Sequence, residues 1–333
     1  MQDFISISLV YLGIYALSTL SLNLQYGYAG IINFGWIVFQ AIGAYVAAVT
    51  SLGPASPSGF QHYIFGARLP FPLPLVMGTL AGAALALVLG GLILTRRIRK
   101  DFQAIILLVV AIIAAQVVIA AVGIFNGANG VSGVPKPFNG VFRLSYHGYQ
   151  WFYVGWMAAI CLVVYVGLEW LCRTSWGRAL RAVREDDVLA GYAGVNIQAL
   201  RVVVFVLGGA IAGFSGALLV EFLGTWSPDA WSFVETFVVF VAVYVGGRGN
   251  NFGAIIGALL VPVIFGTMPS FLPQFGYAGL TANLEWILIA LLWLITFYLR
   301  PAGILPERRH IAIRPRATQT TKALSQRAKV PAT

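Results

Sequence analysis

The chain has 333 residues, of which 59% are hydrophobic and only 10% are charged, and its mean hydropathy is +0.85. A soluble protein of this length cannot bury so much apolar surface, so the composition excludes a soluble globular protein and indicates that lipid surrounds most of the chain. The formal net charge is +10, but the basic residues lack interleaved stacking aromatics in any soluble domain. This pattern argues against nucleic-acid binding and is typical of membrane topology signals.

Apolar segments long enough to cross about 30 Å of hydrocarbon as helices recur along the sequence. They predict an all-α, polytopic membrane helix bundle of about nine transmembrane helices, within a range of about eight to ten. The predicted spans lie near residues 3–22, 31–50, 72–94, 102–122, 151–171, 199–221, 233–246, 252–267 and 284–299. The seventh and eighth are short and are joined by the glycine-rich stretch 246–250, so we expect short broken or re-entrant segments.

The positions of Lys and Arg predict the orientation, because short loops rich in these residues stay on the cytoplasmic side of a membrane. With nine spans and an external N-terminus, 18 of the 21 basic residues lie inside, and only Arg68, Lys136 and Arg143 lie outside. We therefore expect the N-terminus outside and the C-terminus in the cytoplasm. Residues 1–306 form the predicted transmembrane domain, and the basic residues 307–333 form a predicted disordered cytoplasmic tail.

Glycines recur at four-residue spacing inside several predicted spans. The pairs are Gly78 and Gly82, Gly209 and Gly213, and Gly253 and Gly257. Such rows let helix backbones approach closely where lipid gives no hydrophobic drive for association. Tight helix packing is the ordinary role of these pairs, and the lining of a narrow substrate path is the alternative.

The start of the second predicted span combines glycines with an amide side chain. Broken backbone at membrane depth is tolerated only where protein or a water-filled cavity covers it, so this region is a candidate lining element. The predicted translocation-path residues are Gly30, Asn33, Gly35, Gly43 and, on the sixth span, Gly213. For Asn33, a helix cap is the alternative role.

A charged stretch at residues 176–196, WGRALRAVREDDVLAGYAGVN, stands alone between two long apolar segments. Thr174 or Ser175 is expected to cap a short helix that begins at Trp176. On that helix, basic side chains share one face, while Leu180 and Val183 share another. An amphipathic helix held between two spans is suited to inserting into a groove on a soluble partner.

The alternative for this stretch is a basic helix that rests on anionic lipid headgroups, which leaves its acidic residues unexplained. We therefore favour docking to a partner. The predicted docking residues are Trp176, Arg178, Arg181, Arg184, Glu185, Asp187 and Gly194.

The sequence contains no motif for catalysis or for nucleotide binding. It lacks G-x-S-x-G, H-E-x-x-H and the phosphate-binding G-x-x-x-x-G-K-[ST] pattern, and its three histidines lie in three different loops. We therefore expect no catalytic residue, no metal site and no cofactor in this chain. If ATP drives its activity, a partner must hold the nucleotide.

Six segments carry a family resemblance. They are YGYAGIINFGWIVFQAIGAY at 26–45, NGANGVSGVP at 126–135, SWGRALRAVREDDVLAGYAGVN at 175–196, GGAIAGFSGAL at 208–218, GGRGNNFGAIIGA at 246–258 and RPAGILP at 300–306. In these segments the chain resembles the M-type permease subunits of ATP-binding cassette (ABC) importers for branched-chain amino acids, to which urea and short-amide permeases are related. Leu189, Ala190 and Arg248 depart from the usual pattern, as does the segment 101–121.

The resemblance implies a multi-pass subunit of the bacterial cytoplasmic (inner) membrane that transports rather than catalyses. It further implies a paired H-type permease, two cytoplasmic ATPase subunits that bind ATP and Mg, and a periplasmic or extracellular solute-binding protein. Residues 173–198 would be the coupling loop that carries the ATPase motion to the spans. The substrate stays open among branched-chain amino acids, urea, amides and aromatic acids, and a stand-alone channel for a small neutral solute is the alternative function.

Overall fold

The computed structural model describes residues 2–55, 60–96, 98–138, 145–267 and 280–307, with side chains omitted for residues 280–282. The predicted tail beyond Glu307 lies outside the described residues. The first helices in chain order are α1 (Gln2–Leu22), the π-helix η1 (Asn23–Tyr28), α2 (Trp36–Ser51), α3 (Leu73–Ile93) and α4 (Lys100–Ala120). The next elements are α5 (Val122–Phe125), η2 (Gly127–Asn129), β1 (Val131–Ser132), α7 (Tyr146–Arg173), α8 (Ser175–Glu185), α9 (Asp187–Tyr192) and α10 (Ile197–Leu223). The last are β2 (Thr225–Trp226), η3 (Pro228–Trp231), α11 (Phe233–Gly246), α12 (Asn251–Ala258), the π-helix η4 (Leu259–Phe265) and α13 (Leu280–Leu299).

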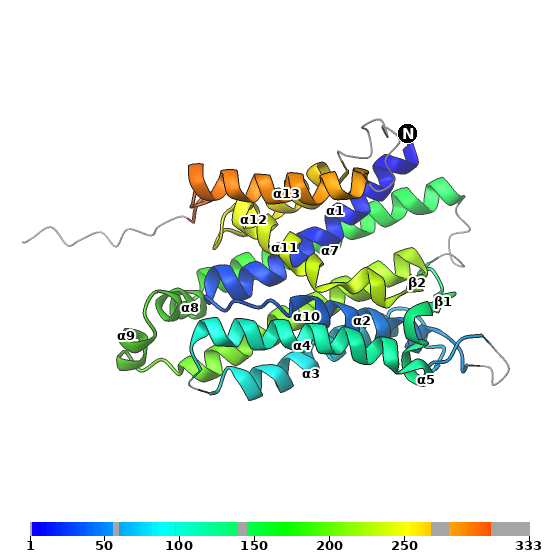
Figure 1. The fold of residues 1–333 in the computed structure, drawn as a ribbon, viewed down its shortest axis with the longest axis horizontal. Helices are drawn as coiled ribbons and strands as arrows, with labels where there is room; N and C mark the ends of the chain where they lie inside the picture. Colours follow the sequence, from blue (N-terminus) through cyan, green and yellow to red (C-terminus); the bar gives the residue numbers. More distant parts are fainter. Residues whose placement is uncertain (1, 56–59, 97, 139–144, 268–279, 308–333) are drawn as a thin grey trace, which may run out of the picture.

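The predicted apolar segments coincide with helices, which pack together in one bundle (Figure 1). Five of the described helices are long and apolar enough to cross a membrane, namely 2–28, 73–93, 100–120, 146–173 and 197–223, while α2, α11, α12–η4 and α13 are shorter. The expected all-α membrane bundle is therefore confirmed, and the count of nine crossings stays a prediction.

The backbone between the first two helices breaks within the bundle. The first helix continues as a π-helix to Tyr28, and the second begins only at Trp36, later than the predicted residue 31. The connector 29–35 is not helical, and Gly30 adopts a φ of +69°, which glycine reaches without steric cost. Broken segments were expected at this place and at the glycine-rich turn 246–250.

The core forms where α2, α3 and α10 approach one another closely. A side chain at Gly43 would collide with the backbone of Gly213 in α10, and one at Gly213 would collide with the backbone of Gly78 and Gly82 in α3. A Cβ at Gly78 would lie 2.5 Å from the carbonyl oxygen of Gly43, and one at Gly82 would lie 2.5 Å from that of Gly209. These contacts confirm that the predicted glycine rows pack helices against each other.

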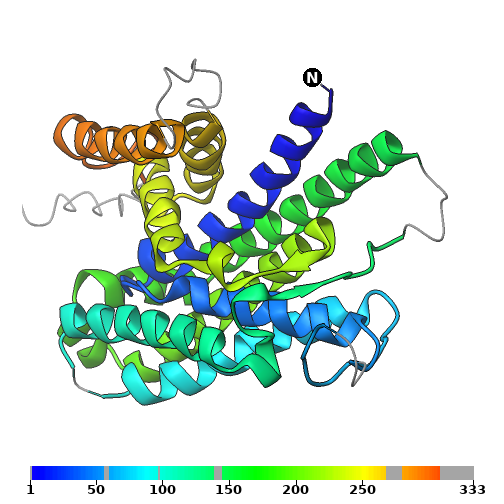
Figure 2. The same ribbon diagram turned by 45° about the vertical axis from the view of Figure 1, so that its right-hand side comes forward.

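The helices divide into an inner and an outer set. In the most apolar window of the first span, 61% of the residues are buried, compared with 17% for α7 and 22% for α4. α1 runs beside α7 and also packs on α10 of the inner group (Figure 2). The outer helices therefore present apolar side chains where lipid or another membrane subunit can cover them.

Two short connections tie the ends of the bundle. At one end, β1 pairs antiparallel with β2 through Val131 and Trp226. At the end that carries α8 and α9, the segment 300–307 lies along the turn between α11 and α12 (Figure 1). There the amides of Ile304 and Leu305 donate to the carbonyls of Val245 and Gly246, at 2.8 and 3.0 Å. We call residues 300–307 the C-terminal strap.

Candidate functional site

Two short helices, α8 and α9, form the connection between α7 and α10 and project from one end of the bundle (Figure 1). α8 begins at Ser175, and Thr174 occupies the N-cap position without a side-chain cap. The expected capping by Thr174 or Ser175 is therefore wrong. The Thr174 hydroxyl instead donates to the carbonyl of Leu171 at 2.7 Å, satisfying an acceptor at the end of α7.

The caps of this region come from two other residues. The Asp186 carboxylate accepts hydrogen bonds from the amides of Val188 and Leu189, at 2.8 and 3.0 Å, and so starts α9. The Asn196 side chain accepts from the amide of Ala199 at 3.1 Å and starts α10. Both helix starts are thus fixed by local side chains.

α8 has the two faces that its sequence predicts. Leu180 and Val183 are completely buried against the bundle. Gly177 lies directly against the backbone of Cys172, which leaves no room for a side chain. The helix is therefore anchored by an apolar face on the end of α7.

The basic residues of α8 bind within the chain. Glu307 of the strap lies 2.6 Å from Arg184 Nη2 and 3.3 Å from Arg181 Nε, so it pairs with both arginines. Arg184 Nη1 also donates to the carbonyl of Gly27 in η1. Arg181 Nη2 donates to the carbonyl of Cys172 at 2.6 Å. α8 is thus tied at once to α7, to the end of the first span and to the strap.

The surroundings of Arg184 stabilise its charged form. Burial acts to lower the pKa of its guanidinium, but hydrogen bonds and attraction from Glu307 and Glu185 outweigh that effect and raise the pKa above its ordinary value. Since arginine is already charged at neutral pH, this higher pKa does not change the charge of Arg184 there.

Asp187 connects the same loop to two other elements. It pairs with Arg201 of α10 at 2.5 Å and with Lys100 of α4 at 3.5 Å. Lys100 is the first residue of α4 and directly follows a basic stretch of the sequence. The starts of α4, α9 and α10 therefore meet at this carboxylate.

The predicted docking residues separate into two groups. Arg181, Arg184 and Asp187 are engaged inside the chain, whereas Arg178 and Gly194 are exposed and Trp176 is half-buried. Glu185 is exposed as well, although its carboxylate lies 2.9 Å from Arg184 Nη2. Gly194 has a φ of +83° just after the end of α9. The docking role of the whole set stays a prediction.

Sequence reasoning missed the most exposed part of the loop. On α9, the side chains of Val188, Leu189 and Tyr192 are 64%, 66% and 86% exposed. Three large apolar side chains open to solvent on one short helix are typical of a protein interface. Their signal in the sequence was the apolar residues that follow the acidic pair Asp186 and Asp187 in a hydrophilic loop.

A cavity of about 860 Å³ opens beside α8. Its wall includes side chains of α7, α8, α12 and the strap, among them Tyr165, Glu169, Arg178, Phe252 and Glu307. Because its lining mixes charged, polar and aromatic groups, the cavity can hold water. The side of α8 that borders the cavity is not packed against the other helices that the structure describes.

The predicted path residues lie in tight contacts. Asn33 is completely buried, donates to Gln25 Oε1 at 2.8 Å and accepts from the amide of Gly35 at 3.1 Å. Gln25 in turn donates to the carbonyl of Phe205 in α10 at 3.3 Å. This chain of hydrogen bonds satisfies part of the broken connector inside the bundle.

The glycines of that set have different neighbours. Gly30 faces Arg184 of α8, and Gly35 faces the backbone of Leu107 in α4. Gly43 and Gly213 form the contact between α2 and α10 described above. None of the five predicted path residues is among those that line the cavity beside α8. Their role in a path stays a prediction.

Further buried polar contacts join the inner helices. Gln40 of α2 donates to Ser18 of α1 at 3.3 Å and to Ser215 of α10 at 3.0 Å. Asn23 of η1 donates to Asn251 of α12 at 3.1 Å. The broken first span is thus linked by hydrogen bonds to α2, α10 and α12.

Comparison with known proteins gives a consistent result. The family described as "Branched-chain amino acid transport system / permease component" matches residues 4–297. The chain is 27% identical to the probable branched-chain amino acid transport permease protein LivM of Methanocaldococcus jannaschii, over 92% of this chain and 94% of the relative.

Two Escherichia coli proteins of high-affinity branched-chain amino acid transport systems are also similar. The permease protein LivM is 29% identical over 89% of this chain and 68% of its own length. The permease protein LivH is 27% identical over 75% of this chain and 80% of its own length. No solved structure matches the chain.

Proposed function

The chain belongs to the branched-chain amino acid permease family, and from this premise we propose that it is a membrane-spanning permease subunit of an ABC importer. Together with a paired LivH-like permease, it forms the translocation path for branched-chain or other hydrophobic amino acids. The observation that carries this proposal is the exposed pair α8–α9, which projects from the bundle and is tied by ion pairs to the strap, α10 and α4.

The docking surface for a cytoplasmic ATPase consists of the outer residues of that pair. These are Arg178, Glu185, Val188, Leu189, Tyr192 and Gly194. The apolar side chains of α9 supply the area that a groove on the ATPase buries, and the flanking charges supply orientation. ATP and Mg are bound by the two ATPases, since this chain has no phosphate-binding loop.

The internal contacts of α8 define how ATPase motion reaches the spans. A push on α9 moves α8 through their shared junction, and α8 is bonded to the carbonyl of Gly27 by Arg184. From η1 the displacement passes through Gln25 to α10 and through Asn23 to α12. A change at the ATPase thereby alters the packing of the helices that enclose the path.

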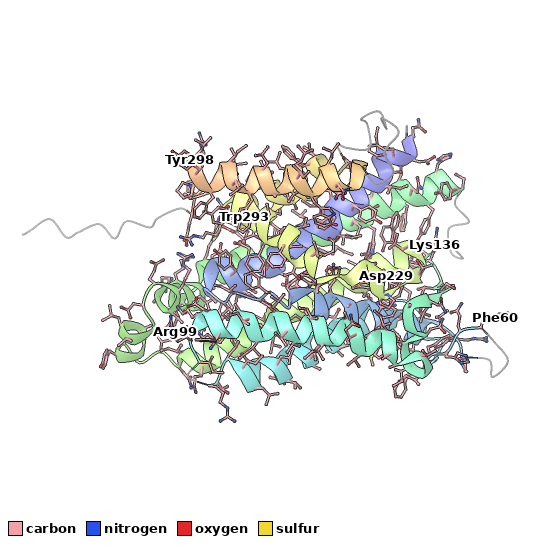
Figure 3. All side chains as sticks on the ribbon, viewed as in Figure 1. Phe60, Arg99, Lys136, Asp229, Trp293 and Tyr298 are labelled. Carbon is pink, nitrogen blue, oxygen red and sulfur yellow. The ribbon has the colours of Figure 1, made fainter. Side chains whose placement is uncertain are left out.

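The proposed orientation has nine crossings, the N-terminus outside and the C-terminus in the cytoplasm. Its support is that Arg99 lies at the same end of the bundle as α8 and α9, while Lys136 lies at the opposite end (Figure 3). The contact between Lys100 and Asp187 joins these loops directly. We place the protein in the bacterial inner membrane, facing a periplasmic or extracellular solute-binding protein at the end near β1 and β2.

The first test is affinity purification of the chain from its native membrane in mild detergent, with mass spectrometry and an ATPase assay of the eluate. Recovery of a second permease and of ATPase subunits with ATP turnover is the expected result. A chain recovered alone, which moves a small solute into liposomes without ATP, would overturn the proposal in favour of a channel.

A further inference from the structure

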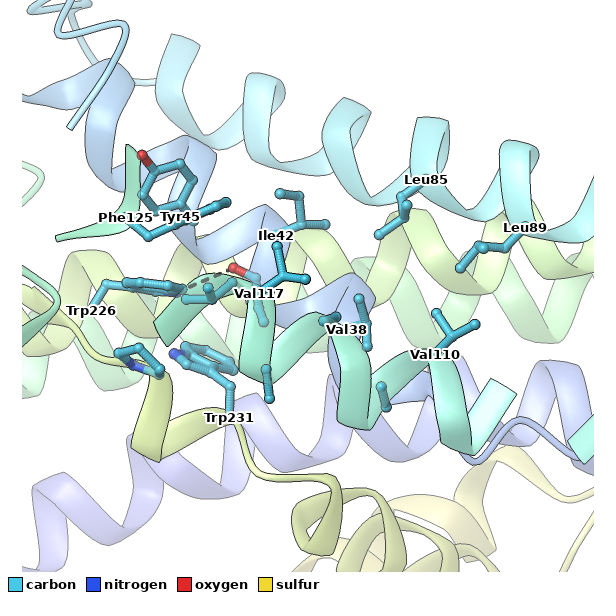
Figure 4. A pocket seen from close by; sticks show the side chains of 16 residues that line it. Val38, Ile42, Tyr45, Leu85, Leu89, Val110, Val117, Phe125, Trp226 and Trp231 are labelled. Carbon is cyan, nitrogen blue, oxygen red and sulfur yellow. Dashed lines mark hydrogen bonds between the residues drawn. The ribbon is translucent and has the colours of Figure 1, made fainter. Parts of the chain in front are cut away.

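An apolar slot lies between α2, α3 and α4, with a cavity volume of about 240 Å³ (Figure 4). Aromatic side chains close one end, namely Tyr45, Phe125, Trp226 and Trp231, and the aliphatic side chains of Leu85, Leu89 and Val110 lie toward the other. The volume is below the roughly 300–1,000 Å³ usual for sites that enclose a whole small molecule. The slot is thus suited to one slender apolar group.

The lining offers almost no polar partner. None of the residues that line the slot is charged. The Tyr45 hydroxyl donates to the carbonyl of Ile124, and Trp226 Nε1 donates to the carbonyl of Ala41 at 3.2 Å. The Nε1 of Trp231 is different, since it is a buried donor without a hydrogen-bond partner among the described residues, and Trp231 is only 6% exposed. Buried donors in proteins nearly always have a partner, so this N–H is open to one from a bound molecule.

The same lining excludes the transported solute as the occupant. A free amino acid carries an ammonium and a carboxylate, and burial of either charge without a partner costs several kcal/mol or more. A single indole N–H cannot offset both. The slot therefore differs in chemistry from any transport site for zwitterions.

The position of the slot points to the membrane. α3 packs on α2 and α10, and α4 packs on α2, but most residues in the apolar windows of both α3 and α4 are not buried within the chain. Both helices carry large exposed apolar side chains next to it, for example Leu87 and Val88 on α3 and Ile113 on α4. Its aromatic end lies near β2, at the end of the bundle remote from α8 and α9, where a membrane–water interface favours Trp and Tyr.

We propose that the slot binds one acyl chain of a membrane phospholipid. The chain runs from the aromatic end toward Leu89 and fills the space between α4 and its neighbours. An ester or phosphate oxygen of the same lipid accepts the hydrogen bond of Trp231 Nε1. The bound lipid thereby supports α4, which has few contacts of its own with the inner helices. This site is separate from the docking surface on α9 and does not depend on it.

The test uses the assembled complex in nanodiscs that contain a phospholipid with a photoreactive diazirine in its acyl chain. After illumination, peptide mass spectrometry maps the adducts. We expect adducts on residues 110–118 and 226–231. Ala114→Phe, which fills the slot, should lower their yield about tenfold, because it replaces several buried methylenes of the lipid. Ile113→Phe on the outward face of α4 should leave the yield unchanged.

A second variant tests the hydrogen bond. Trp231→Phe keeps the ring and removes the donor, so it should lower the adduct yield severalfold while the complex still assembles. Wild-type adducts spread evenly over α3 and α4, or an equal yield for Ala114→Phe and wild type, would overturn the proposal. The proposal would also be overturned if a photoreactive residue placed at 114 cross-linked to the second permease. The wild-type map decides the question even where a variant does not assemble.

Discussion

The two short helices that follow one another between α7 and α10 use opposite chemistry. α8 carries most of the charge of the loop, and its two inner arginines are bound by Glu307, Gly27 and Cys172 of the same chain. α9 carries its apolar residues outward, with Tyr192 86% exposed. The inner arginines of α8 thus bind within the same chain, whereas the apolar side chains of α9 are exposed.

This contrast shows that charge in an aqueous loop is a weak indicator of docking. A charged side chain is well solvated in water and can equally form an ion pair within its own chain, so its presence does not identify an interface. An apolar side chain held open to water is costly unless something covers it. In this loop, the exposed apolar side chains of α9 therefore indicate a docking surface more strongly than the arginines of α8 do.

The largest expected effect comes from Tyr192→Asp. It places a charge where the docking surface is most apolar, and central aromatic anchors account for much of the binding energy of interfaces, so ATPase association should weaken at least about thirtyfold. The measurement is ATPase binding to the permease pair in nanodiscs. Tyr192→Phe is the matched control and should bind as wild type does. If Tyr192→Asp also bound as wild type does, α9 would not be the docking helix.

Arg184→Ala should act on stability rather than directly on docking. It leaves the Gly27 carbonyl without its donor and Glu307 with a single arginine, which should cost about 2 kcal/mol of stability. Thermal unfolding in detergent measures the loss, and Glu307→Gln should produce a similar one. The double variant should lose much less than the sum, since both changes remove one interaction. Additive losses would show that the two side chains act independently.

The sequence predicted the elements of this region better than their contacts. The apolar runs located the helices, and the spacing of Leu180 and Val183 correctly predicted the buried face of α8. The same reasoning assigned Arg181 and Arg184 to a partner, because it had no means to place Glu307, 123 residues further along, beside Arg184. Local periodicity contains no information on such long-range pairs.

The core shows the same limit. Glycine spacing correctly predicted that α3 and α10 take part in close packing, but it did not reveal that Asn33 is buried and bonded to Gln25. A buried amide and one that lines a path have the same signature in the sequence. The burial of Asn33 follows from its hydrogen bond to Gln25, which lies on the π-helix η1. The sequence gives no strong pattern for a π-helix, so this contact could not be predicted.

Asp186→Ala tests whether α9 must be preformed in order to dock. The change removes the acceptor for the amides of Val188 and Leu189, and loss of such a cap costs about 1 kcal/mol. The amides of residues 188–192 should therefore exchange hydrogen faster, and ATPase affinity should fall about fivefold. Asp186→Asn, which keeps an acceptor oxygen, should restore both. Unchanged affinity with faster exchange would mean that α9 folds on its partner.

The smallest effect should come from Arg178→Ala, and it separates the two kinds of contact most directly. Arg178 is the exposed arginine of α8 and borders the cavity beside that helix, so its loss should leave thermal unfolding unchanged, in contrast to Arg184→Ala. If its charge orients the ATPase, the association rate should fall about two- to threefold at low salt, and the difference should vanish near 0.5 M salt, where screening shortens the range of charge effects to a few ångströms. An equal loss of association rate at both salt concentrations would instead indicate that Arg178 packs against the ATPase. One arginine of α8 would then form part of the packed docking surface, which would not be confined to α9.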